Sequence, residues 1–385
     1  MNCGVPERLP GRFGIDLMEK SFKGFYKNKK VLVTGHTGFK GSWLSIWLNE
    51  LGAEVLGYSL EPPTVPNNFS VCRLGSRVQS VIGDVRDFEH LFEVFQRFKP
   101  DVVFHLAAQS LVRYSYEVTR YTIDVNVMGS ANILEAVRLT PSVTGLVMVT
   151  SDKCYENREQ VWGYKENDPM GGDDPYSASK GAAEIVIRSY LRSFFSHREN
   201  LGAASGRAGN VIGGGDWAND RILVDCIKAL SQKRAIQVRN PSAIRPWQHV
   251  LEPLGGYLLL GARLNEDRLK FSGGWNFGPA DSAARSVGDL VKAVVAEWGS
   301  GEWMDVSNQN DKTLHEAGWL RLSCDKAHTL LPWSSVLDFD ECVQNTVQWY
   351  KHFYESKDAN LYQYCVHQIR SYTELAEKRG QGWAR

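Results

Sequence analysis

The feature that most constrains the fold is a run of spaced glycines, Gly35-His36-Thr37-Gly38-Phe39-Lys40-Gly41. An apolar run, Val31 to Val33, precedes it, and an amphipathic stretch rich in tryptophan and leucine follows it. Strand, tight loop and helix is the order in which a dinucleotide site is built. Gly35 permits the turn, Gly38 permits close approach of a pyrophosphate, and Gly41 lets the new helix sit against the strand. The helix N-terminus then offers unpaired N–H groups and the positive end of its dipole to phosphates.

This spacing is G-x-x-G-x-x-G rather than the simplest fingerprint, G-x-G-x-x-G, so an ordinary strand-to-helix turn is an alternative. The form TGxxGFxG resembles the extended short-chain dehydrogenase/reductase family. The resemblance implies an α/β fold, a doubly wound Rossmann-type parallel sheet with a smaller C-terminal substrate-binding lobe. It also implies an NAD cofactor held at Gly35, Thr37, Gly38, Phe39, Lys40 and Gly41.

Length and charge limit the partners of this chain. With 385 residues it exceeds what one core usually serves, which favours two lobes. It carries 44 basic and 44 acidic residues, so its formal net charge is zero. No global field attracts nucleic acid or an anionic membrane, and we expect neither as a partner. An anionic substrate would have to be held by local arginines.

Cysteine usage indicates a reducing, cytoplasmic location. The 7 cysteines are scattered, without the spacing of a zinc site, so we expect reduced thiols and no metal. No apolar stretch is long enough to span a membrane. The first 17 residues lack the apolar core of a signal peptide. We expect residues 1–18 to form a disordered N-terminal extension.

Strand and helix patterns alternate up to about residue 210. Strands are expected at 31–33, 53–58, 78–82, 101–109, 144–150 and 203–208, and helices at 88–98, 119–139 and 175–196. Beyond residue 210, clusters of glycine, proline and tryptophan break this alternation. We therefore assign 19–210 to an NAD-binding Rossmann domain. Residues 211–385 are expected to form mainly the substrate-binding domain, with short returns such as Gly274 to Gly278 to the first sheet.

The ends of the predicted strands supply the rest of the cofactor site. Tyr58-Ser59-Leu60-Glu61 has no acid at the strand tip and no arginine for a 2′-phosphate, which favours NAD over NADP. By the family resemblance, Asp84 and Val85 contact the adenine, although Asp84 could instead cap the following helix. The tip Leu106-Ala107-Ala108-Gln109 would let the backbone lie against the cofactor. His105, inside this apolar strand, is predicted to be a satisfied core histidine.

Tyr176 and Lys180 are four residues apart and therefore share one face of a predicted helix. A lysine ammonium nearby favours the phenolate and lowers the tyrosine pKa, and it can also hold the nicotinamide ribose. Ser151, at the end of a predicted strand, can bond the substrate hydroxyl. Together these residues resemble the Ser–Tyr–Lys set of short-chain dehydrogenases, with Tyr176 and Lys180 also contacting the cofactor.

Asp152 and Lys153 follow Ser151 directly, and here the chain resembles nucleotide-sugar 4,6-dehydratases. The usual family pattern is Thr-Asp-Glu, so a lysine stands where a glutamate base is expected. A lysine acts as a base only if burial or another cation lowers its pKa. A surface ion pair is the alternative for these two residues. Ser-Asp-Lys-Cys-Tyr, Gly-Gly-Gly-Asp-Trp and Arg-Pro-Trp-Gln-His-Val resemble the dehydratases that act on CDP-glucose.

This resemblance implies a lyase reaction on CDP-D-glucose that yields CDP-4-keto-6-deoxy-D-glucose. Tyr176 would take the 4-hydroxyl proton while NAD oxidises carbon 4. Lys153 would remove the carbon 5 proton, Asp152 would protonate the leaving 6-hydroxyl, and the hydride would return to carbon 6. Such products belong to deoxysugar biosynthesis for lipopolysaccharide O-antigen.

Four residues are candidates for holding the substrate, and all are polar or basic: Asn126, Asn210, Arg221 and Arg245. The planar guanidinium matches phosphate oxygens. Arg221 could equally lie on the surface. Trp217 and Trp247 could line the sugar or base pocket or simply pack in the core.

Two other classes of function fit parts of this sequence. A nucleotide-sugar epimerase or reductase needs Ser, Tyr and Lys but no acid–base pair after the serine. A non-catalytic NAD-binding regulator needs none of them. GDP-mannose and dTDP-glucose compete with CDP-glucose as substrates. The long helices predicted at 119–139 and 175–196 commonly pair in this family, so we expect a homodimer or a dimer of dimers.

Overall fold

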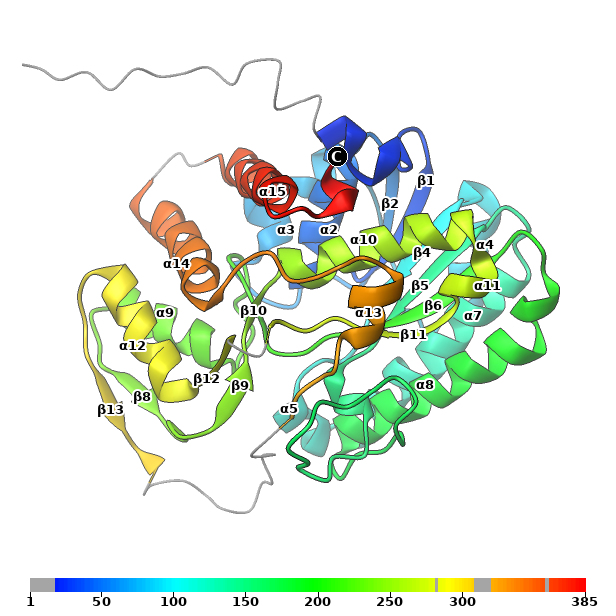
Figure 1. Cartoon of the computed structure of the whole chain (residues 1–385). Helices are drawn as coiled ribbons and strands as arrows, with labels where there is room; N and C mark the ends of the chain where they lie inside the picture. The colour runs from blue at the N-terminus through cyan, green and yellow to red at the C-terminus, as the bar shows by residue number, and fades with distance from the viewer. Residues whose placement is uncertain (1–17, 281–282, 308–319, 357–359) are drawn as a thin grey trace, which may run out of the picture.

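The computed structural model describes residues 18–280, 283–307, 320–356 and 360–385. Its centre is a parallel sheet of seven strands in the order β11-β6-β5-β4-β1-β2-β3 (Figure 1). These strands are β1 (Lys30–Thr34), β2 (Glu54–Ser59), β3 (Gln79–Ile82), β4 (Val102–His105), β5 (Gly145–Val149), β6 (Gly202–Arg207) and β11 (Gly273–Asn276). The order reverses between β1 and β4, which makes this the switch point of a doubly wound sheet. The predicted fold class is confirmed.

Helices cover both faces of the sheet (Figure 1). One layer holds α4 (Phe88–Phe98), α7 (Gly129–Arg138) and α8 (Pro175–Ser193), which pack side by side. The other holds α2 (Phe39–Glu50), α10 (Leu251–Glu266) and α15 (Leu361–Lys378). Both faces are therefore apolar, and β5 is buried along its whole length. Such a sheet is rigid enough to hold side chains at its carboxyl edge.

The predicted helix at 119–139 is one continuous helical stretch with an irregular middle. It comprises α6 (Thr119–Ile123), a π-helical turn at Asp124–Met128, and α7. The π turn carries Asn126, and such turns occur often at functional sites. A short helix that the sequence did not indicate, α5 (Val112–Glu117), precedes it.

A second lobe is built from the chain beyond residue 210 and lies beside the carboxyl edge of the sheet (Figure 1). Its helices are α9 (Ile222–Ser231), α12 (Val287–Trp298) and α14 (Phe339–Glu355), which pack on one another. Its short strands are β7 (Val211–Ile212), β8 (Ile236–Val238), β9 (Ile244–Pro246), β10 (Gln248–His249), β12 (Ala284–Ser286) and β13 (Trp303–Asp305). Two further short helices of the chain beyond residue 210 are α11 (Arg268–Phe271) and α13 (Asp325–Leu330). A third short helix, α3 (Asn68–Val71), belongs to the first lobe and packs on α2.

The chain past residue 210 also returns to the first lobe. β11 pairs with β6 from Gly273↔Ala204 to Asn276↔Arg207, so the expected return of Gly274 to Gly278 is a true sheet strand. The returns are longer than expected, because α10 packs on β5 and β6 and α15 packs on α2. The roles predicted for the two domains stay predictions.

Met18 is 2% exposed and lies in the core near Thr373. Met18 is therefore not part of a disordered extension, and the rest of the predicted extension, residues 1–17, lies outside the described residues. Across the helices that the structure describes, none combines the length and apolar character needed to cross a bilayer.

Candidate active site

A cavity of about 790 Å³ opens at the carboxyl ends of the sheet strands, between the two lobes. This is the edge of an open α/β sheet where ligands bind. Every residue predicted for the site lines this cavity, with the single exception of Asn126. The size suits a ligand as large as a drug or a cofactor. The structure thus brings the predicted residues together, and their individual roles stay predictions.

The glycine loop has the close approaches that a dinucleotide cradle needs. Gly35 has a φ of +77°, and a Cβ there would lie 2.8 Å from the backbone nitrogen of Ala107. A Cβ at Gly41 would lie 2.0 Å from the carbonyl oxygen of Gly35. Gly41 therefore packs against the loop itself. The sequence analysis had predicted that it packs against the strand. Gly38 is the N-cap of α2, and no side chain caps the helix there.

The open N-terminus of α2 fits the phosphates of NAD, since no side chain occupies its cap and small residues surround it. Thr37 is tied to the end of β2, because its Oγ1 lies 2.8 Å from Ser59 Oγ and donates to Leu60 O at 2.9 Å. Asp84 is held by Arg86, whose Nη2 lies 2.6 Å from Asp84 Oδ2. The cap of α4 is Asp87 instead, so the alternative role of Asp84 as a helix cap is wrong.

His105 is a satisfied core residue, as predicted. Its ring nitrogens lie 2.7 Å from Thr34 Oγ1 and 3.2 Å from Ser130 Oγ. Burial, and then the charge of Lys180, lower the pKa of His105 to about 3. The ring is thus a neutral strut between β1, β4 and α7 and carries no charge at the site.

Ser151, Asp152 and Tyr176 lie together at the end of β5. Ser151 Oγ donates to Asp152 Oδ1 at 2.8 Å. All three are buried, with Asp152 only 4% exposed. Ser151 also caps a 3-10 turn, Asp152–Cys154, by accepting from Lys153 N. That turn is what points Asp152 back toward the serine.

The environment of Tyr176 differs from the expectation that a lysine lowers its pKa. Burial raises the pKa of Tyr176 to about 12, although the neighbouring hydroxyl of Ser151 acts in the opposite direction. Burial also lowers the pKa of Lys180 to about 8. Lys180 is 5% exposed. Desolvation disfavours both charged forms, so it dominates over the lysine's influence in this cavity.

Lys40 adds a second buried ammonium to the cavity. Burial, with repulsion from Arg221 and Lys180, lowers the pKa of Lys40 to about 8, while Asp152 and Asp216 act in the opposite direction. Lys153, the predicted base, lines the same cavity and is partly buried. The cavity therefore brings together the amine side chains of three lysines and several carboxylates, Asp152 and Asp216 among them.

A buried ion pair supports this group, and sequence analysis missed it. Arg207 Nη2 lies 2.7 Å from Glu184 Oε2, with side chains 5% and 4% exposed. Glu184 also accepts from Thr150 at 2.5 Å and from Ser205 at 2.9 Å. Glu184 lies one turn past Lys180 on α8, and Thr150 directly precedes Ser151. The i, i+4, i+8 spacing of Tyr176, Lys180 and Glu184 is a signal that could have placed Glu184 on the face of α8 that bears the site, although it does not point to Arg207.

Asn126 does not line the cavity, so its predicted contact with substrate is not supported. It is 1% exposed. Its Nδ2 donates to Gln109 O at 3.0 Å and to Ser179 Oγ at 2.9 Å, and its Oδ1 accepts from Gln109 N. With its polar atoms engaged, Asn126 supports the Gln109 wall from behind and links it to α8.

The other three substrate candidates lie in the cavity wall of the second lobe. Arg221 forms an ion pair with Asp216 at 2.8 Å and is not a free surface residue. Asn210 Nδ2 lies 3.3 Å from Asp152 Oδ2. Arg245 lies on β9, paired in register with Arg285 of β12. Two arginines facing one cavity suit an anionic group such as a diphosphate.

The two tryptophans both line the cavity and pack in the core, so each expectation holds in part. Trp217 lies against Trp349, Tyr350 and Phe353. Trp247 Nε1 donates to Arg285 O at 3.2 Å.

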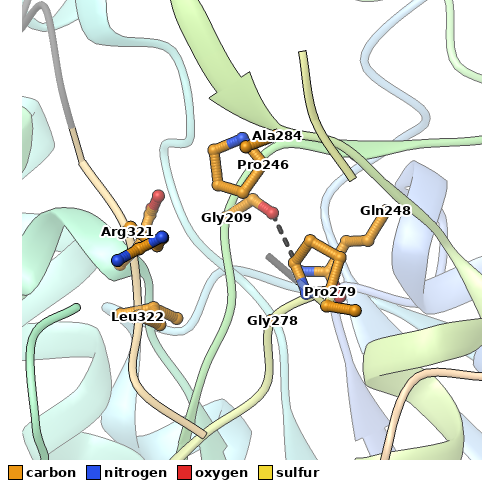
Figure 2. A pocket seen from close by; sticks show the side chains of 10 residues that line it. Gly209, Pro246, Gln248, Gly278, Pro279, Ala284, Arg321 and Leu322 are labelled. Carbon is orange, nitrogen blue, oxygen red and sulfur yellow. Dashed lines mark hydrogen bonds between the residues drawn. The ribbon is translucent and has the colours of Figure 1, made fainter. Parts of the chain in front are cut away.

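Asp152 also lines a second, small hollow of about 10 Å³. Figure 2 shows this hollow with eight of its other lining residues labelled. Pro246, Gln248, Pro279 and Leu322 contribute to its wall, and Gln248 Nε2 donates to Gly209 O at 2.9 Å. Gln248 Oε1 is buried without a hydrogen-bond partner in the described part of the chain. The hollow is about the size of one water molecule. The hollow therefore has room for one water molecule beside Asp152.

The site combines a tyrosine, a carboxylic acid and amines beside a dinucleotide cradle. Such a set can oxidise an alcohol and then move protons at neighbouring carbons. Among the described residues, no group of three or more His, Cys, Asp or Glu could hold a metal ion.

Comparison with known proteins decides the family. The profile of the family described as GDP-mannose 4,6 dehydratase matches residues 32–346, well over half of the chain. The chain belongs to the GDP-mannose 4,6-dehydratase family. The matched range includes nearly all of the sheet, the residues that line the cavity, and the two candidate arginines, Arg221 and Arg245. The resemblance to nucleotide-sugar dehydratases that the motifs indicated is confirmed.

Two relatives place the chain within this family. A CDP-glucose 4,6-dehydratase of Salmonella typhimurium is 49% identical over 340 residues, which cover 87% of this chain and 94% of that protein. A GDP-mannose 4,6-dehydratase of Vibrio cholerae is 32% identical over 238 residues, covering 57% of this chain and 61% of that protein.

Solved structures share the family fold. A UDP-glucose 4-epimerase of Thermotoga maritima superposes with a TM-score of 0.71 at 20% identity, covering 84% of this chain and 99% of that one. A dTDP-glucose 4,6-dehydratase of Bacillus anthracis, in complex with NAD, gives a TM-score of 0.69 at 20% identity, covering 85% and 98%. At such identities these structures establish the fold alone.

Proposed function

We propose that this protein is an NAD-dependent hydro-lyase that converts CDP-D-glucose to CDP-4-keto-6-deoxy-D-glucose. One observation carries the proposal: Ser151, Asp152 and Lys153 at the end of β5 meet Tyr176 and Lys180 of α8 in one cavity. An epimerase or reductase does not need the acid and amine after the serine. The relative that is 49% identical is named as a CDP-glucose 4,6-dehydratase, which supports CDP as the nucleotide of the substrate.

Bound NAD would accept a hydride from carbon 4 of the sugar and later return it to carbon 6. Tyr176 takes the proton of the 4-hydroxyl, and Ser151 lies beside Tyr176 at the end of β5. Lys153 removes the proton on carbon 5, which the neighbouring ketone has made acidic. Asp152 protonates the 6-hydroxyl, which leaves as water. Lys180 holds the nicotinamide ribose, and Arg221 and Arg245 hold the diphosphate.

The decisive experiment offers the protein CDP-, dTDP- and GDP-hexoses and follows the product by mass spectrometry. We expect loss of one water with CDP-glucose and a 4-keto-6-deoxy product. In Lys153→Ala, elimination should stall while oxidation at carbon 4 partly persists. Full dehydratase turnover in that variant would contradict the role of Lys153, and epimerisation without water loss would contradict the function.

Assembly and cellular context complete the proposal. Large apolar side chains are exposed on α6, the π turn and α8, including Ile123 (44%), Met128 (53%) and Ile185 (50%). These helices pack side by side, so a second copy could cover them and form a homodimer. Light scattering of the purified protein tests this. The product suits cytoplasmic deoxysugar biosynthesis for lipopolysaccharide O-antigen.

A further inference from the structure

Tyr176, Ser151 and Asp152 lie next to one another in the cavity at the end of β5. Ser151 Oγ donates to Asp152 Oδ1 at 2.8 Å. Burial raises the pKa of Tyr176 to about 12, and the neighbouring hydroxyl of Ser151 acts in the opposite direction. The backbone N–H of Lys153 donates to the same Oγ at 3.2 Å. Ser151 and Tyr176 are each 6% exposed, and Asp152 is 4% exposed. The three side chains are therefore largely shielded from bulk water.

The direction of these bonds follows from the hydrogen count of a hydroxyl. A serine hydroxyl has one hydrogen to give and two lone pairs to receive with, whereas an ionised carboxylate only accepts. Ser151 gives its hydrogen to Asp152, and the backbone N–H of Lys153 occupies one lone pair of the serine oxygen. The other lone pair is open to the neighbouring phenol of Tyr176, which can approach it only as a donor. The order is thus phenol to serine to carboxylate, which is the order that proton transfer requires.

This inference rests on the proposed function, which leaves the proton balance of Tyr176 and of Asp152 incomplete. Tyr176 gains a proton from the 4-hydroxyl of the sugar. Asp152 loses a proton to the departing 6-hydroxyl. Lys153 takes a proton from carbon 5 and gives it back to the same carbon, so its own balance is zero. In each turnover Tyr176 must therefore give up one proton, and Asp152 must gain one.

We propose that Ser151 relays this proton, so that oxidation at carbon 4 loads the acid that later expels water. As the O4–H bond breaks, its proton goes to Tyr176 Oη. The proton already on Tyr176 passes to Ser151 Oγ, and the serine proton passes to Asp152 Oδ1. In the elimination, the acid O–H bond of Asp152 breaks, its proton joins O6, and the C6–O6 bonding pair leaves with the water. No outside acid or base is consumed.

This relay also accounts for the burial of the tyrosine. A phenol whose pKa is about 12 is rarely ionised at neutral pH. A relay removes the need for a standing phenolate, because Tyr176 gives up one proton while it accepts another. The alternative donor is a water molecule in the small hollow beside Asp152. In that case the proton from Tyr176 would leave the protein during oxidation.

The two routes differ in proton release, which can be counted. CDP-6-deoxyglucose has no leaving hydroxyl, so its reaction stops after oxidation at carbon 4. In weakly buffered solution, a pH indicator reports released protons while near-ultraviolet absorbance reports reduced nicotinamide. For the wild-type protein we expect close to zero protons per reduced nicotinamide. For Asp152→Asn, which has no carboxylate to receive the proton, we expect close to one.

Two substitutions at the serine test the relay itself. Ser151→Ala should release close to one proton per reduced nicotinamide and slow oxidation by roughly 100-fold, the usual scale for losing proton transfer. Ser151→Thr keeps a hydroxyl, as in the usual Thr-Asp-Glu pattern of the family, and should restore a count near zero. A serine that only packed or only held the substrate would change the rate without changing this count.

The outcomes separate the relay from the function on which it rests. Loss of water from CDP-glucose by the wild-type protein, with equal proton release from CDP-6-deoxyglucose in wild-type and Asp152→Asn proteins, would overturn the relay alone. If no nucleotide hexose loses water or reduces the cofactor, the proposed function fails and the relay fails with it. A count near zero in wild type and Ser151→Thr, and near one in Ser151→Ala and Asp152→Asn, supports both.

Discussion

Replacing Arg207 by methionine should strongly destabilise the protein, because it leaves the carboxylate of Glu184 buried without a counter-charge. The two side chains are 5% and 4% exposed and 2.7 Å apart. Arg207 also donates to Tyr155 Oη at 2.7 Å and to Glu166 O at 3.0 Å. After the change, Glu184 keeps only the hydroxyls of Thr150 and Ser205 as donors. Breaking a buried ion pair from one side costs about 3–5 kcal/mol, which is the loss we expect.

Chemical unfolding followed by tryptophan fluorescence measures this loss, with the midpoints of the variants compared. Arg158→Met is the matched control, because its pair with Glu156 has side chains 64% and 48% exposed. Exposed pairs contribute at most about 1 kcal/mol. Replacing both Glu184 and Arg207 by methionine removes both charges at once. We expect this double variant to recover at least half of the loss.

The pH dependence gives the same test a direction. Burial alone would raise the pKa of Glu184, but Arg207, Thr150 and Ser205 hold the pKa below its usual value. A carboxyl whose folded pKa is lowered stabilises the fold above its unfolded pKa of about 4.3. That contribution disappears as the pH falls through the lower, folded pKa. In Arg207→Met, acid should no longer remove this contribution.

A small effect would refute the reasoning. If Arg207→Met costs no more than Arg158→Met, the pair does not stabilise the fold. If the double variant is no more stable than Arg207→Met, the loss comes from packing rather than from an uncompensated charge.

Three other predictions follow from single contacts. Gly209→Ala would place a Cβ 1.9 Å from Asp152 Oδ2, a movable side-chain atom; we expect a nearly unchanged melting temperature but at least a roughly tenfold loss of water elimination, and an unchanged rate would contradict it. Gly41→Ala would place a Cβ 2.0 Å from the backbone oxygen of Gly35, whereas Gly382→Ala meets nothing within 4 Å; calorimetry should find weakened NAD binding only in the former, and equal affinities would contradict the fit. Burial raises the pKa of Glu252 to about 7, although hydrogen bonds from Val336, Leu337 and Tyr372 act in the opposite direction. The contribution of Glu252 to the free energy of unfolding is therefore most favourable below its unfolded pKa of about 4.3 and is lost as the pH rises through 7, by roughly 3 kcal/mol. Glu252→Gln should flatten that part of the curve of melting temperature against pH, and an equal slope in both proteins would count against it.

Local sequence patterns predicted the sheet, and they predicted site residues that, apart from Asn126, line one cavity. Short β-branched runs ending in glycine or small residues marked β1, β4 and β5, and the four-residue spacing of Tyr176 and Lys180 placed both on one helix face. These signals are local, so they do not depend on how distant segments meet.

Contacts between residues far apart in the sequence could not be predicted from local patterns. Nothing near Glu184 in the sequence indicates that Arg207 neutralises it, and nothing near Asn126 indicates that Gln109 and Ser179 use its polar atoms. The raised pKa of Tyr176 depends on burial by several elements at once, which spacing on one helix cannot report.

The return of α10, β11 and α15 to the first lobe has a consequence for anyone who recombines such enzymes. A chimera made with one crossover at residue 210 would transplant an edge strand of the sheet and two covering helices together with the sugar-facing wall. The foreign elements would then have to match a surface for which they were not shaped. Exchanging only 211–250 and 279–338, with four junctions, would change the wall and leave the native scaffold whole.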